Sequence, residues 1–539
     1  MSKIFEQLVE KRGLSTEFLN PHYEDLKDPF LLLDMKKAVA RIKKAIKEGE
    51  RILIYGDYDV DGVTASTVME KTLRMAGVTE EKTEIMLPDR FADGYGMSPK
   101  LVSRAKEWNA GLVVTVDCGS RNHEIINELN HLGIDCIVTD HHETGEDLPD
   151  ALAVINPKRK DCKDDNLREL AGVGVAFKLA QALMKEGMIE PGKEKWLLDL
   201  VLIGTVCDNM SLTGENHILG FYGFKVLAKT RLVGLRELMK RAGVKNLNSE
   251  SIGFQIGPRL NAAGRLKTAE LSLNLLCCNN APEAATIAEE LDDLNKKRKT
   301  EQKTVTNEIK KRGVLPGSVI IETGKWHEGI LGIVAGRLME EYGKPAFVLT
   351  EMDNGILKGS GRSFGDFSLD KALKCAGNTI ISGGGHAAAA GVKIKQEDLW
   401  AFREKINEYY ESLNLKNQTE YLKSKPDLEI ESIGELNLEL MEELKQLEPF
   451  GQGNEEPIFL LKGVKIHEVR KMGSESQHLR IDVRGKDGKI MKLVAFFAPK
   501  EWMNLDPGYD EIEPVIKLVE NEFNGVRSVE GRILDVNMV

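Results

Sequence analysis

The stretch that decides the fold lies at residues 52–62 and reads Ile52-Leu53-Ile54-Tyr55-Gly56-Asp57-Tyr58-Asp59-Val60-Asp61-Gly62. Its short apolar run predicts a buried β-strand. Three aspartates follow at every second position, a spacing that points all three carboxylates to one side of extended backbone. Carboxylates so close together raise one another's pKa unless a cation is present, and oxygen ligands suit Mg²⁺ or Mn²⁺. The stretch therefore predicts a metal site at a strand end; a polar Asp-Gly turn is the simpler alternative.

Composition describes an ordinary globular protein. With 539 residues the chain is too long for one core, so we expect about three or four domains. The chain is 42% hydrophobic and 29% charged, which is typical of soluble proteins. Neither a signal peptide nor a membrane-spanning run is recognisable, and the seven cysteines include no CxxC pair. These features predict a cytoplasmic protein with free thiols and no membrane partner.

The net charge of −11 argues at first against a nucleic-acid partner. A metal-binding carboxylate cluster would supply part of that negative charge, however. An acidic protein can also hold nucleic acid in a locally basic groove. Composition alone therefore leaves the partner open.

Two further apolar runs along the chain also end in acids or histidines. The run at 111–116 ends at Asp117, and the run at 136–139 ends at Asp140-His141-His142. Helical patterns at 98–108 and 124–132 lie between the runs, and this alternation predicts a parallel sheet with both faces covered. The functional crevice of such a sheet lies beyond the carboxyl ends of its strands, where these residues sit. Asp208 follows another apolar run, 197–206, whose pattern leaves strand and helix open.

The rest of the chain divides by composition and periodicity. Residues 1–48 are expected to be largely helical, and 49–280 to form the α/β lobe with the acids. The charged stretch 281–312 predicts a connecting helix, because a mostly polar helix often bridges domains. A smaller α/β lobe is expected at 313–412, then a linker at 413–426. Short strands separated by Gly and Asp-Gly turns predict a small antiparallel barrel at 427–539.

The strand-end residues form a candidate two-metal site, made of Asp57, Asp59, Asp61, Asp117, His141 and Asp208. Two divalent ions roughly 3.5–4 Å apart suit in-line displacement at phosphorus, and an imidazole ligand favours Mn²⁺ over Ca²⁺. Neighbouring side chains in extended backbone point apart, so we expect one histidine to bind metal while the other meets the phosphate. Arg90, in a Gly-containing loop, could fork onto a phosphate, although most arginines are simply solvated.

Ordered motifs then reveal a family resemblance. GDYDVDG (56–62), LPDRFADGYG (87–96), VDCG (116–119), DHH (140–142) and GTVCD (204–208) resemble the DHH phosphoesterase superfamily. Later motifs resemble its RecJ family of single-strand-specific exonucleases: LAGVGVAFKLA (170–180), IGPRLNAAGRL (256–266), WHEGILGIVAGRL (326–338), GSGRS (359–363), GGGHAAAAG (383–391) and LEPFGQGNEEPIF (447–459). The resemblance covers essentially the whole chain.

The resemblance implies a DHH lobe, a long connecting helix, a DHH-associated lobe and an oligonucleotide-binding (OB-type) barrel. It implies that the six candidate ligands bind Mn²⁺ or Mg²⁺, two per active site, with His142, Asp59 and Asp117 acting in catalysis and His142 beside the scissile phosphate. It also implies substrate contacts from Arg90, Ser360, Arg362 and His386, and from Arg259 or Arg265, between which the sequence does not decide.

The implied activity is 5′→3′ hydrolysis of single-stranded DNA to nucleoside 5′-monophosphates, in DNA repair and recombination. The alternative is a phosphodiesterase of the same superfamily that acts on short RNA or small nucleotides. Neither the polarity nor the choice of DNA over RNA can be derived from the residues alone, because no feature reports on the 2′-hydroxyl. A scaffold with a degenerate site is disfavoured, because the acids of every motif are intact.

The resemblance also suggests protein partners, and the chain departs from the family pattern at two points. The resemblance suggests a monomer, with single-stranded-DNA-binding protein or a helicase as candidate protein partners. The family often continues past the barrel with a protein-interaction domain, whereas this chain stops at Val539, and its usual Ala-Asp-x-x-Pro-Leu here has Ser211 in place of proline. The barrel has few aromatic residues, which favours tracking of the DNA backbone by six basic residues: Lys462, Lys465, Arg470, Lys471, Arg480 and Arg484.

Overall fold

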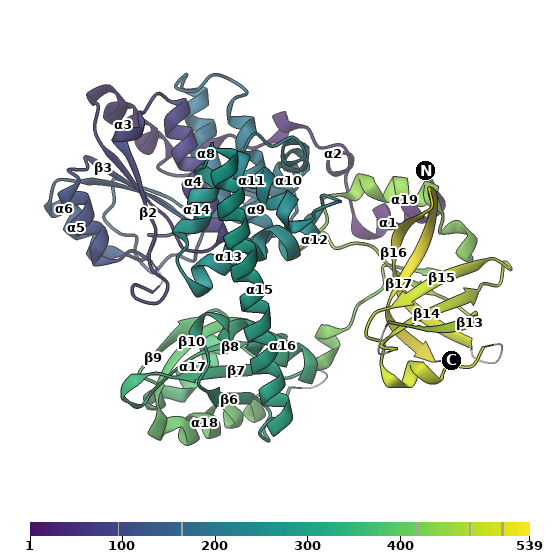
Figure 1. The fold of residues 1–539 in the computed structure, drawn as a ribbon. Helices are drawn as coiled ribbons and strands as arrows, with labels where there is room; N and C mark the ends of the chain where they lie inside the picture. Colours follow the sequence, from purple (N-terminus) through teal and green to yellow (C-terminus); the bar gives the residue numbers. More distant parts are fainter. Residues whose placement is uncertain (95, 163–164, 416–417, 474–475, 508–510, 539) are drawn as a thin grey trace.

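The structure is a computed structural model that describes residues 1–94, 96–162, 165–415, 418–473, 476–507 and 511–538. Figure 1 shows three bodies. The first lobe, residues 49–280, is joined through the long helix α15 (Ala281–Arg312) to a smaller second lobe, residues 313–412, which lies below it. The C-terminal domain, residues 427–538, lies beside both and carries the last strands.

The first lobe is built on a five-stranded sheet with the order β2-β1-β3-β4-β5, in which every pair is parallel. Its strands are β1 (Ile52–Tyr55), β2 (Thr83–Met86), β3 (Leu112–Val116), β4 (Asp135–Thr139) and β5 (Ala153–Ile155). The order of connection reverses between β1 and β3, and in open α/β sheets the functional crevice lies at such a switch point. The predicted parallel sheet is confirmed.

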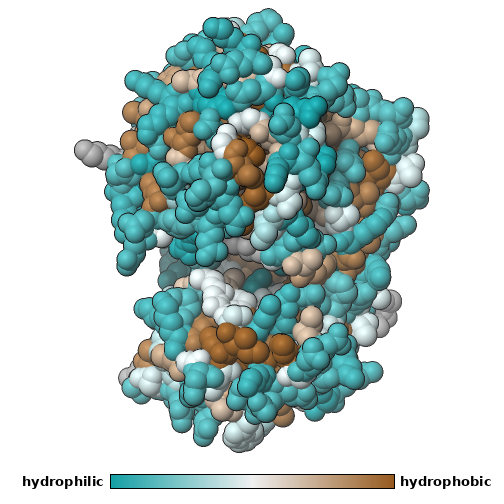
Figure 2. Space-filling view, turned by 90° about the vertical axis from the view of Figure 1, so that its left-hand side faces the viewer, coloured by the Kyte–Doolittle hydropathy of each residue, from teal (hydrophilic) through white to brown (hydrophobic). Residues whose placement is uncertain are grey.

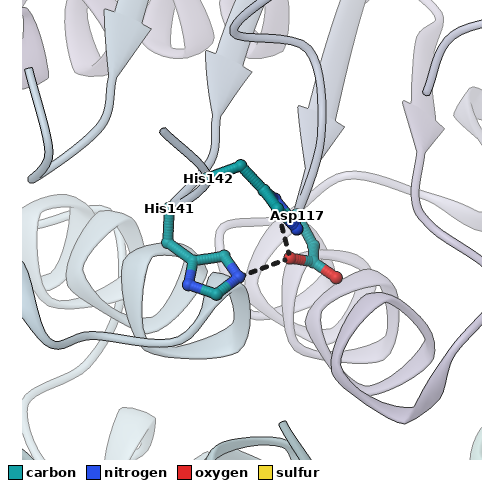
Figure 3. A group of neighbouring side chains, drawn as sticks. All are labelled: Asp117, His141 and His142. Atoms are coloured by element: carbon teal, nitrogen blue, oxygen red, sulfur yellow. Dashed lines mark ion pairs between the residues drawn. The ribbon is translucent and has the colours of Figure 1, made fainter. Parts of the chain in front are cut away.

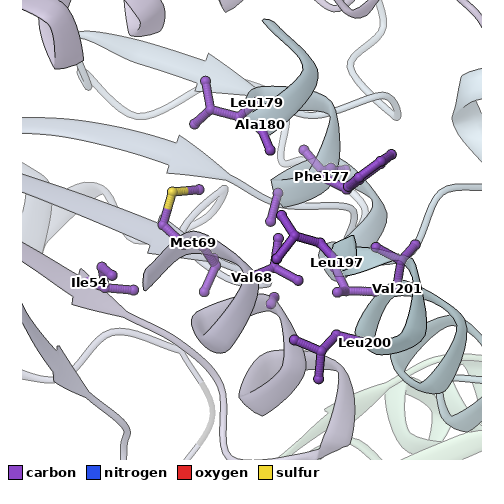
Figure 4. Packing of buried hydrophobic residues seen from close by; sticks show 14 of the residues in the cluster. Ile54, Val68, Met69, Phe177, Leu179, Ala180, Leu197, Leu200 and Val201 are labelled. Atoms are coloured by element: carbon purple, nitrogen blue, oxygen red, sulfur yellow. The ribbon is translucent and has the colours of Figure 1, made fainter. Parts of the chain in front are cut away.

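Both faces of this sheet are buried, as parallel sheets require. Ile52 and Ile54 face one apolar core, and Leu53 and Tyr55 face the other. Helices α5 (Pro99–Glu107) and α6 (His123–His131) cover the second face. On the first face, α4 (Val60–Met75), α8 (Gly172–Lys185) and α9 (Leu198–Cys207) pack together, as Figure 4 shows for side chains such as Val68, Phe177 and Val201.

The run before Asp208, which the sequence left open, is the helix α9 and not a strand. Every residue from Leu198 to Thr205 is buried, so the helix is apolar all round and carries no periodic signal. A series of helices follows and leads to α15: α10 (Gly214–Leu227), α11 (Val233–Ala242), α12 (Ser249–Ser251), the π-helical turn η5 (Ile252–Ile256), α13 (Gly257–Leu266) and α14 (Glu270–Cys277).

The second lobe has a five-stranded sheet of order β6-β7-β8-β10-β9, with only the β6–β7 pair parallel. Its strands are β6 (Ile320–Gly324), β7 (Ala346–Glu351), β8 (Ile356–Arg362), β9 (Ser382–Gly385) and β10 (Ala389–Lys395). Helix α16 (Leu331–Tyr342) packs on one face, and α17 (Leu369–Ala376) and α18 (Leu399–Ser412) pack on the other. The smaller α/β lobe and the connecting helix are thus as predicted.

The C-terminal domain is a seven-stranded, mostly antiparallel sheet of order β11-β12-β16-β13-β14-β15-β17, in which β16 also pairs with β17. Its strands are β11 (Leu428–Ile430), β12 (Ile458–Leu461), β13 (Val464–Met472), β14 (His478–Arg484), β15 (Ile490–Ala495), β16 (Glu511–Phe523) and β17 (Val526–Met538), with helix α19 (Leu438–Leu444) before β12. The short antiparallel strands that the sequence predicts within 427–539 are present.

The N-terminal segment does not behave as one unit. Helix α1 (Lys3–Arg12) buries Ile4, Phe5 and Leu8 in the core of the C-terminal domain, whereas α3 (Met35–Glu48) packs on the first lobe. Arg12 donates hydrogen bonds to both carboxylate oxygens of Asp427, at 2.8 and 3.0 Å. Helix α1 is thereby attached to the C-terminal domain. Among the described residues, no helix combines the length and apolarity that crossing a bilayer would need.

The contact of α1 generates a stability prediction. Phe5→Ala removes a fully buried ring and should cost about 3–5 kcal/mol, as for other truncated core aromatics. Hydrogen–deuterium exchange should accelerate in β12 and β16 and stay unchanged in β1 and β3. Leu31→Ala, at a half-exposed position outside that core, is the matched control. Unchanged exchange in β12 would show that α1 is dispensable to the C-terminal core.

Candidate functional site

The three aspartates of the opening stretch reach one region by different local structures. Asp57 follows β1, Asp59 caps α4 by accepting a hydrogen bond from the Gly62 N–H at 3.1 Å, and Asp61 lies in the first helical turn. The prediction that extended backbone aligns all three was therefore wrong. The chain turns into a helix at Val60, and the strand-to-helix turn brings the carboxylates together instead.

The other candidate site residues, two aspartates and two histidines, come from three more connections near the same edge of the sheet. Asp117 follows β3 with a φ of +61°, a conformation that costs a non-glycine residue free energy and is found most often at functional sites. The pair His141-His142 follows β4, and Asp208 stands at the C-terminal end of α9. Strand ends and one helix end thus surround a single point.

All six candidate ligands lie in groups compact enough to hold a cation. Potential ligand atoms approach within 4.8 Å of one another in three sets: Asp57 with Asp59 and Asp117, Asp61 with His141 and Asp208, and Asp117 with His141 and His142. Asp117 and His141 each belong to two sets. Shared ligands of this kind are what two neighbouring metal ions require.

The two histidines do not point apart as the sequence argument expected. Figure 3 shows both rings turned toward Asp117, with His141 Nε2 3.2 Å and His142 Nδ1 3.8 Å from its Oδ1. The ring centroids are 4.5 Å apart at an interplanar angle of 63°. The chain after β4 bends at Asp140, whose carboxylate accepts hydrogen bonds from the backbone N–H groups of both histidines.

Burial and mutual repulsion raise the pKa values of the clustered carboxyls. Burial, followed by repulsion from Asp59, raises the pKa of Asp57 to about 8 and that of Asp61 to about 7. Burial and repulsion from Asp61 raise the pKa of Asp208 to about 8 and hold that of Asp117 well above its usual range. Raised pKa values favour the protonated forms of these carboxyls unless a cation replaces the protons.

Several buried oxygen and nitrogen atoms of the cluster are also available as ligands for a divalent cation. Asp57 Oδ1, Asp117 Oδ1 and both ring nitrogens of His141 are buried, and none has a hydrogen-bond partner within the described part of the chain. Burial, with the neighbouring His142, lowers the pKa of His141 to about 3, which leaves a neutral imidazole able to ligate. Carboxylate oxygens and one imidazole are a donor set suited to Mn²⁺ or Mg²⁺.

Residues around the ligands hold them in place. The N–H groups of Gly172 and Val173, at the N-terminus of α8, donate to Asp61 at 2.7 and 2.9 Å. A Cβ on Gly172 would come within 2.5 Å of Asp117, so only glycine fits between the two aspartates. This contact gives a physical reason for the LAGVG motif, to which the sequence analysis assigned only a resemblance.

Asp140 is a functional residue that the sequence reasoning missed. Its Oδ1 lies 2.9 Å from His142 Nδ1, and its Oδ2 accepts from the Ser120 N–H. Burial alone would lower the pKa of His142, but the hydrogen bond and charge of Asp140 outweigh it and raise that pKa to about 9. The raised pKa favours the cationic form of His142, and a cation there would suit a phosphate oxygen.

The loop that carries Asp208 is fastened from two sides. Asn216 Nδ2 donates to the Ser211 carbonyl at 2.9 Å, and the Leu212 N–H donates to the Gln452 carbonyl at 2.8 Å. Ser211, which stands where the family has proline, also lies within hydrogen-bond distance of Thr213. The segment that opens the C-terminal domain thus supports the loop of a candidate metal ligand.

A group of four arginines lies beside the carboxylates and spans both lobes and α15: Arg90, Arg265, Arg298 and Arg362. Burial, and then the charges of the other three, lowers the pKa of Arg265 to about 9. None of the four forms an ion pair with a described carboxylate. The Arg90 guanidinium stacks on Tyr58, 4.9 Å from the ring centroid. Figure 2 shows that the surface is hollowed between the first lobe, above, and the second lobe, below. Like charges gathered without carboxylate partners in the described part of the chain make a candidate anion site.

Sequence reasoning found three of these arginines and missed Arg298. Arg298 belongs to a helix with many cations, so no local pattern distinguishes it. Arg265 donates to the Gly329 carbonyl of the second lobe at 3.3 Å, whereas Arg259 is paired with Asp292 of α15 at 2.8 Å. The structure thus places Arg265 in this group and Arg259 outside it, whereas a substrate contact of either arginine stays a prediction.

The remaining predicted contacts lie in the second lobe. Ser360 Oγ accepts a hydrogen bond from Arg362 Nη1 at 2.9 Å, and a Cβ on Gly332 would come within 2.7 Å of Arg362 Nη2. The glycine of WHEGILG thus makes room for this guanidinium. His386 lies in the connection between β9 and β10 and is exposed, and the described residues offer its side chain no hydrogen bond or ion pair.

Half of the basic residues expected to form a surface for DNA on the C-terminal domain are paired with acidic neighbours. Of the six predicted residues, Lys462 pairs with Glu513, Arg470 with Glu468, and Arg480 with Asp482. Acidic residues also outnumber basic ones over 427–539. Phosphate tracking by this surface, as the sequence suggested, is therefore poorly supported by the charges.

Comparison with known proteins agrees with this organisation. Residues 51–205 match the DHH family, N-terminal domain; residues 317–412 match the DHHA1 domain; and residues 427–535 match the RecJ OB domain. The single-stranded-DNA-specific exonuclease RecJ of Bacillus subtilis is 35% identical, over 99% of this chain and 68% of that protein. RecJ of Escherichia coli is also 35% identical, over 93% of this chain and 89% of that protein.

Solved structures give the same result. The structure of RecJ in complex with Mn²⁺ from Thermus thermophilus superimposes with a TM-score of 0.85 at 30% sequence identity, over 99% of this chain and 75% of that one. The complex of the same protein with Mg²⁺ superimposes with a TM-score of 0.79 at 28% identity, over 99% and 74% of the two chains.

The shared ligands lead to a prediction about metal stoichiometry. Asp208 belongs to one of the three sets, whereas Asp117 belongs to two. Asp208→Asn should therefore lower binding from about two Mn²⁺ ions per chain to about one, and Asp117→Asn should weaken both. Mn²⁺ bound at equilibrium can be counted by electron paramagnetic resonance, with Asp199→Asn, a buried acid outside the cluster, as the control. Equal loss in both variants would contradict the division into two positions.

Proposed function

The chain belongs to the RecJ family of the DHH phosphoesterase superfamily, and from this premise we propose that it is a metal-dependent exonuclease that degrades single-stranded DNA from the 5′ end and releases nucleoside 5′-monophosphates. The observation that carries the proposal is the contact between two oppositely charged groups. A cluster of buried carboxylates lies beside four unpaired arginines drawn from both lobes and the connecting helix.

Each group has a chemical task in phosphodiester hydrolysis. Two bound divalent ions would supply a hydroxide nucleophile at neutral pH and neutralise charge on the phosphate. Asp57, Asp59, Asp61, Asp208 and the shared Asp117 and His141 would hold them. Asp59 and Asp117 would orient the attacking hydroxide. His142, positioned by Asp140, would donate a hydrogen bond to a phosphate oxygen.

The arginines supply what distinguishes an exonuclease from other phosphodiesterases. An exonuclease must recognise the end of a strand at a fixed distance from the bond that it cuts. Arg362 and Ser360 belong to the second lobe, whereas the candidate metal ligands belong to the first. Helix α15 links the lobes, and a 5′-terminal phosphate bound by Arg362, Arg265 and Arg298 would place the adjoining linkage at the carboxylates.

The alternative, hydrolysis of short RNA or small nucleotides, is less well supported. A small substrate would not need the C-terminal domain, yet residues 427–535 match the RecJ OB domain. The OB fold is a common binder of single strands. Partners beyond DNA, a monomeric state, and a place in repair and recombination remain expectations from the resemblance. The seven free cysteines support a reducing compartment such as the cytoplasm.

An end-label assay tests polarity and substrate together. With Mn²⁺ present, a 5′-labelled single strand should release labelled mononucleotide at once, whereas a 3′-labelled strand should shorten progressively and release its label last. Duplex DNA and an RNA strand of the same sequence should be cut much more slowly. Early release of the 3′ label would reverse the proposed polarity, and equal hydrolysis of RNA would favour the alternative function.

Recognition of the terminus predicts the effect of Arg362→Ala. Losing one charge-assisted contact should cost about 1.5–3 kcal/mol in binding short strands that carry a 5′-phosphate. Strands with a 5′-hydroxyl should be affected much less, and Mn²⁺ binding should not change. Arg337→Ala, which removes an exposed arginine from α16 of the same lobe, is the matched control. Fluorescence anisotropy in chelator measures both affinities, and a variant that still prefers the 5′-phosphate as strongly as wild type would contradict the assignment.

A further inference from the structure

An aromatic cluster stands on the surface of the C-terminal domain. His478 begins β14, and Phe496 and Phe497 follow the end of β15. The His478 ring meets both phenyl rings edge-on, with centroids 5.4 and 4.8 Å away and interplanar angles of 70° and 82°. Phe496 is 55% exposed and Phe497 is 77% exposed. We call His478, Phe496 and Phe497 the aromatic platform.

The fold does not account for the exposure of these rings. A phenyl side chain stabilises a protein by leaving water, yet more than half of each ring stays exposed. Phe497 also has a φ of +52°, a conformation that a residue other than glycine adopts at a cost. His478 Nδ1 accepts a hydrogen bond from the Phe497 N–H at 2.9 Å and holds this conformation. A costly backbone that presents an apolar ring to solvent points to a binding site.

The platform contacts a cation, and that cation connects it to first-lobe helices that lead to the carboxylate cluster. The Arg532 guanidinium lies over the Phe496 ring, 5.6 Å from its centroid, and 3.9 Å from Glu250 of α12 in the first lobe. From α12 the chain continues through η5, which exposes Phe254, into α13. The first residue of α13, Gly257, packs against Cys207, which directly precedes Asp208. The C-terminal domain therefore meets the first lobe along helices that lead to the candidate metal ligands.

We propose that the aromatic platform, with Arg532, stacks the bases of the single strand downstream of the terminus that the second lobe holds. The inference rests on the proposed function and replaces phosphate tracking with stacking as the grip of the C-terminal domain. Exposed rings accept every base, as a nuclease without sequence preference requires, and Arg532 over the Phe496 ring adds a cation–π contact. Stacking also suits a domain in which half of the six expected basic residues are paired with acids, because it does not depend on free positive charge.

The test removes rings and bases in the same experiment. The double variant Phe496→Ala/Phe497→Ala is compared with wild type on 5′-phosphorylated strands of about 6 and about 20 nucleotides, in chelator, by fluorescence anisotropy. A third strand of about 20 nucleotides keeps its six 5′ bases and carries abasic spacers beyond them. Phe523→Ala removes an equally exposed phenylalanine from the β16–β17 hairpin of the same domain and is the control.

We expect the double variant to bind the long strand roughly 5- to 150-fold more weakly for each base that loses its stack, and the short strand as wild type does. Wild type should lose a similar factor when the downstream bases are replaced by spacers, and the variant should lose nothing further. Phe496→Trp/Phe497→Trp should restore binding, which excludes a folding defect as the cause. Phe523→Ala should bind all three strands as wild type does.

Two results would overturn the inference. One is wild-type affinity of the double variant for the long strand, which would leave the platform to another partner, such as a protein. The other is an equal loss on normal and abasic strands, which would mean that the rings act on the backbone or only on folding. Failure of the proposed function is distinguishable, because wild type itself would then neither bind nor degrade single strands.

Discussion

The accumulation of negative charge at one edge of the first-lobe sheet is the constraint on which the rest of the structure depends. Removing ionised carboxylates from water costs several kcal/mol each unless something compensates, and here four aspartates with raised pKa values surround one point. The chain compensates in part, with the N–H groups of α8 directed at Asp61 and a cationic His142 beside Asp117. The remainder is left for divalent cations, whose binding would displace the protons that these carboxyls otherwise hold.

The same constraint explains why the opposite charge is kept just outside the cluster. Four arginines paired with the aspartates would neutralise the site and leave it unable to bind either metal or phosphate. They are instead held by carbonyls, a hydroxyl, an amide and an aromatic ring: Gly329, Gly361, Ser360, Asn295 and Tyr58. Arg259, whose partner is Asp292, shows the contrasting arrangement in the same helix as Arg265. Because the arginines come from both lobes, the distance between anion site and cluster is set by how α15 joins the lobes.

Sequence reasoning succeeded where one local pattern corresponds to one structure. Strand β1 and its aspartates, the helix α15 and most strands of the C-terminal domain carried such signals. It failed where the deciding contact is distant or the pattern is ambiguous. Nothing in residues 1–12 shows that Phe5 packs against strands more than 400 residues away, and α9 lacks periodicity because it is buried on all sides. The half-exposed strand β2 has no apolar run, and the partner of His142 is its near neighbour Asp140, whose own role only the bend after β4 reveals.

The overall charge of −11 then ceases to conflict with a DNA substrate. Affinity for a polyanion depends on where the cations stand and on whether they are free, not on their sum. Here four arginines without an ion pair to a described carboxylate gather where a terminal phosphate would lie, whereas several surface cations elsewhere pair with neighbouring carboxylates, as Lys462 and Arg480 do. The net negative charge of the chain repels any nucleic-acid backbone, so binding depends on reaching the arginine group. Selectivity for ends can therefore arise from the charge distribution itself, in addition to the shape of the cleft between the lobes.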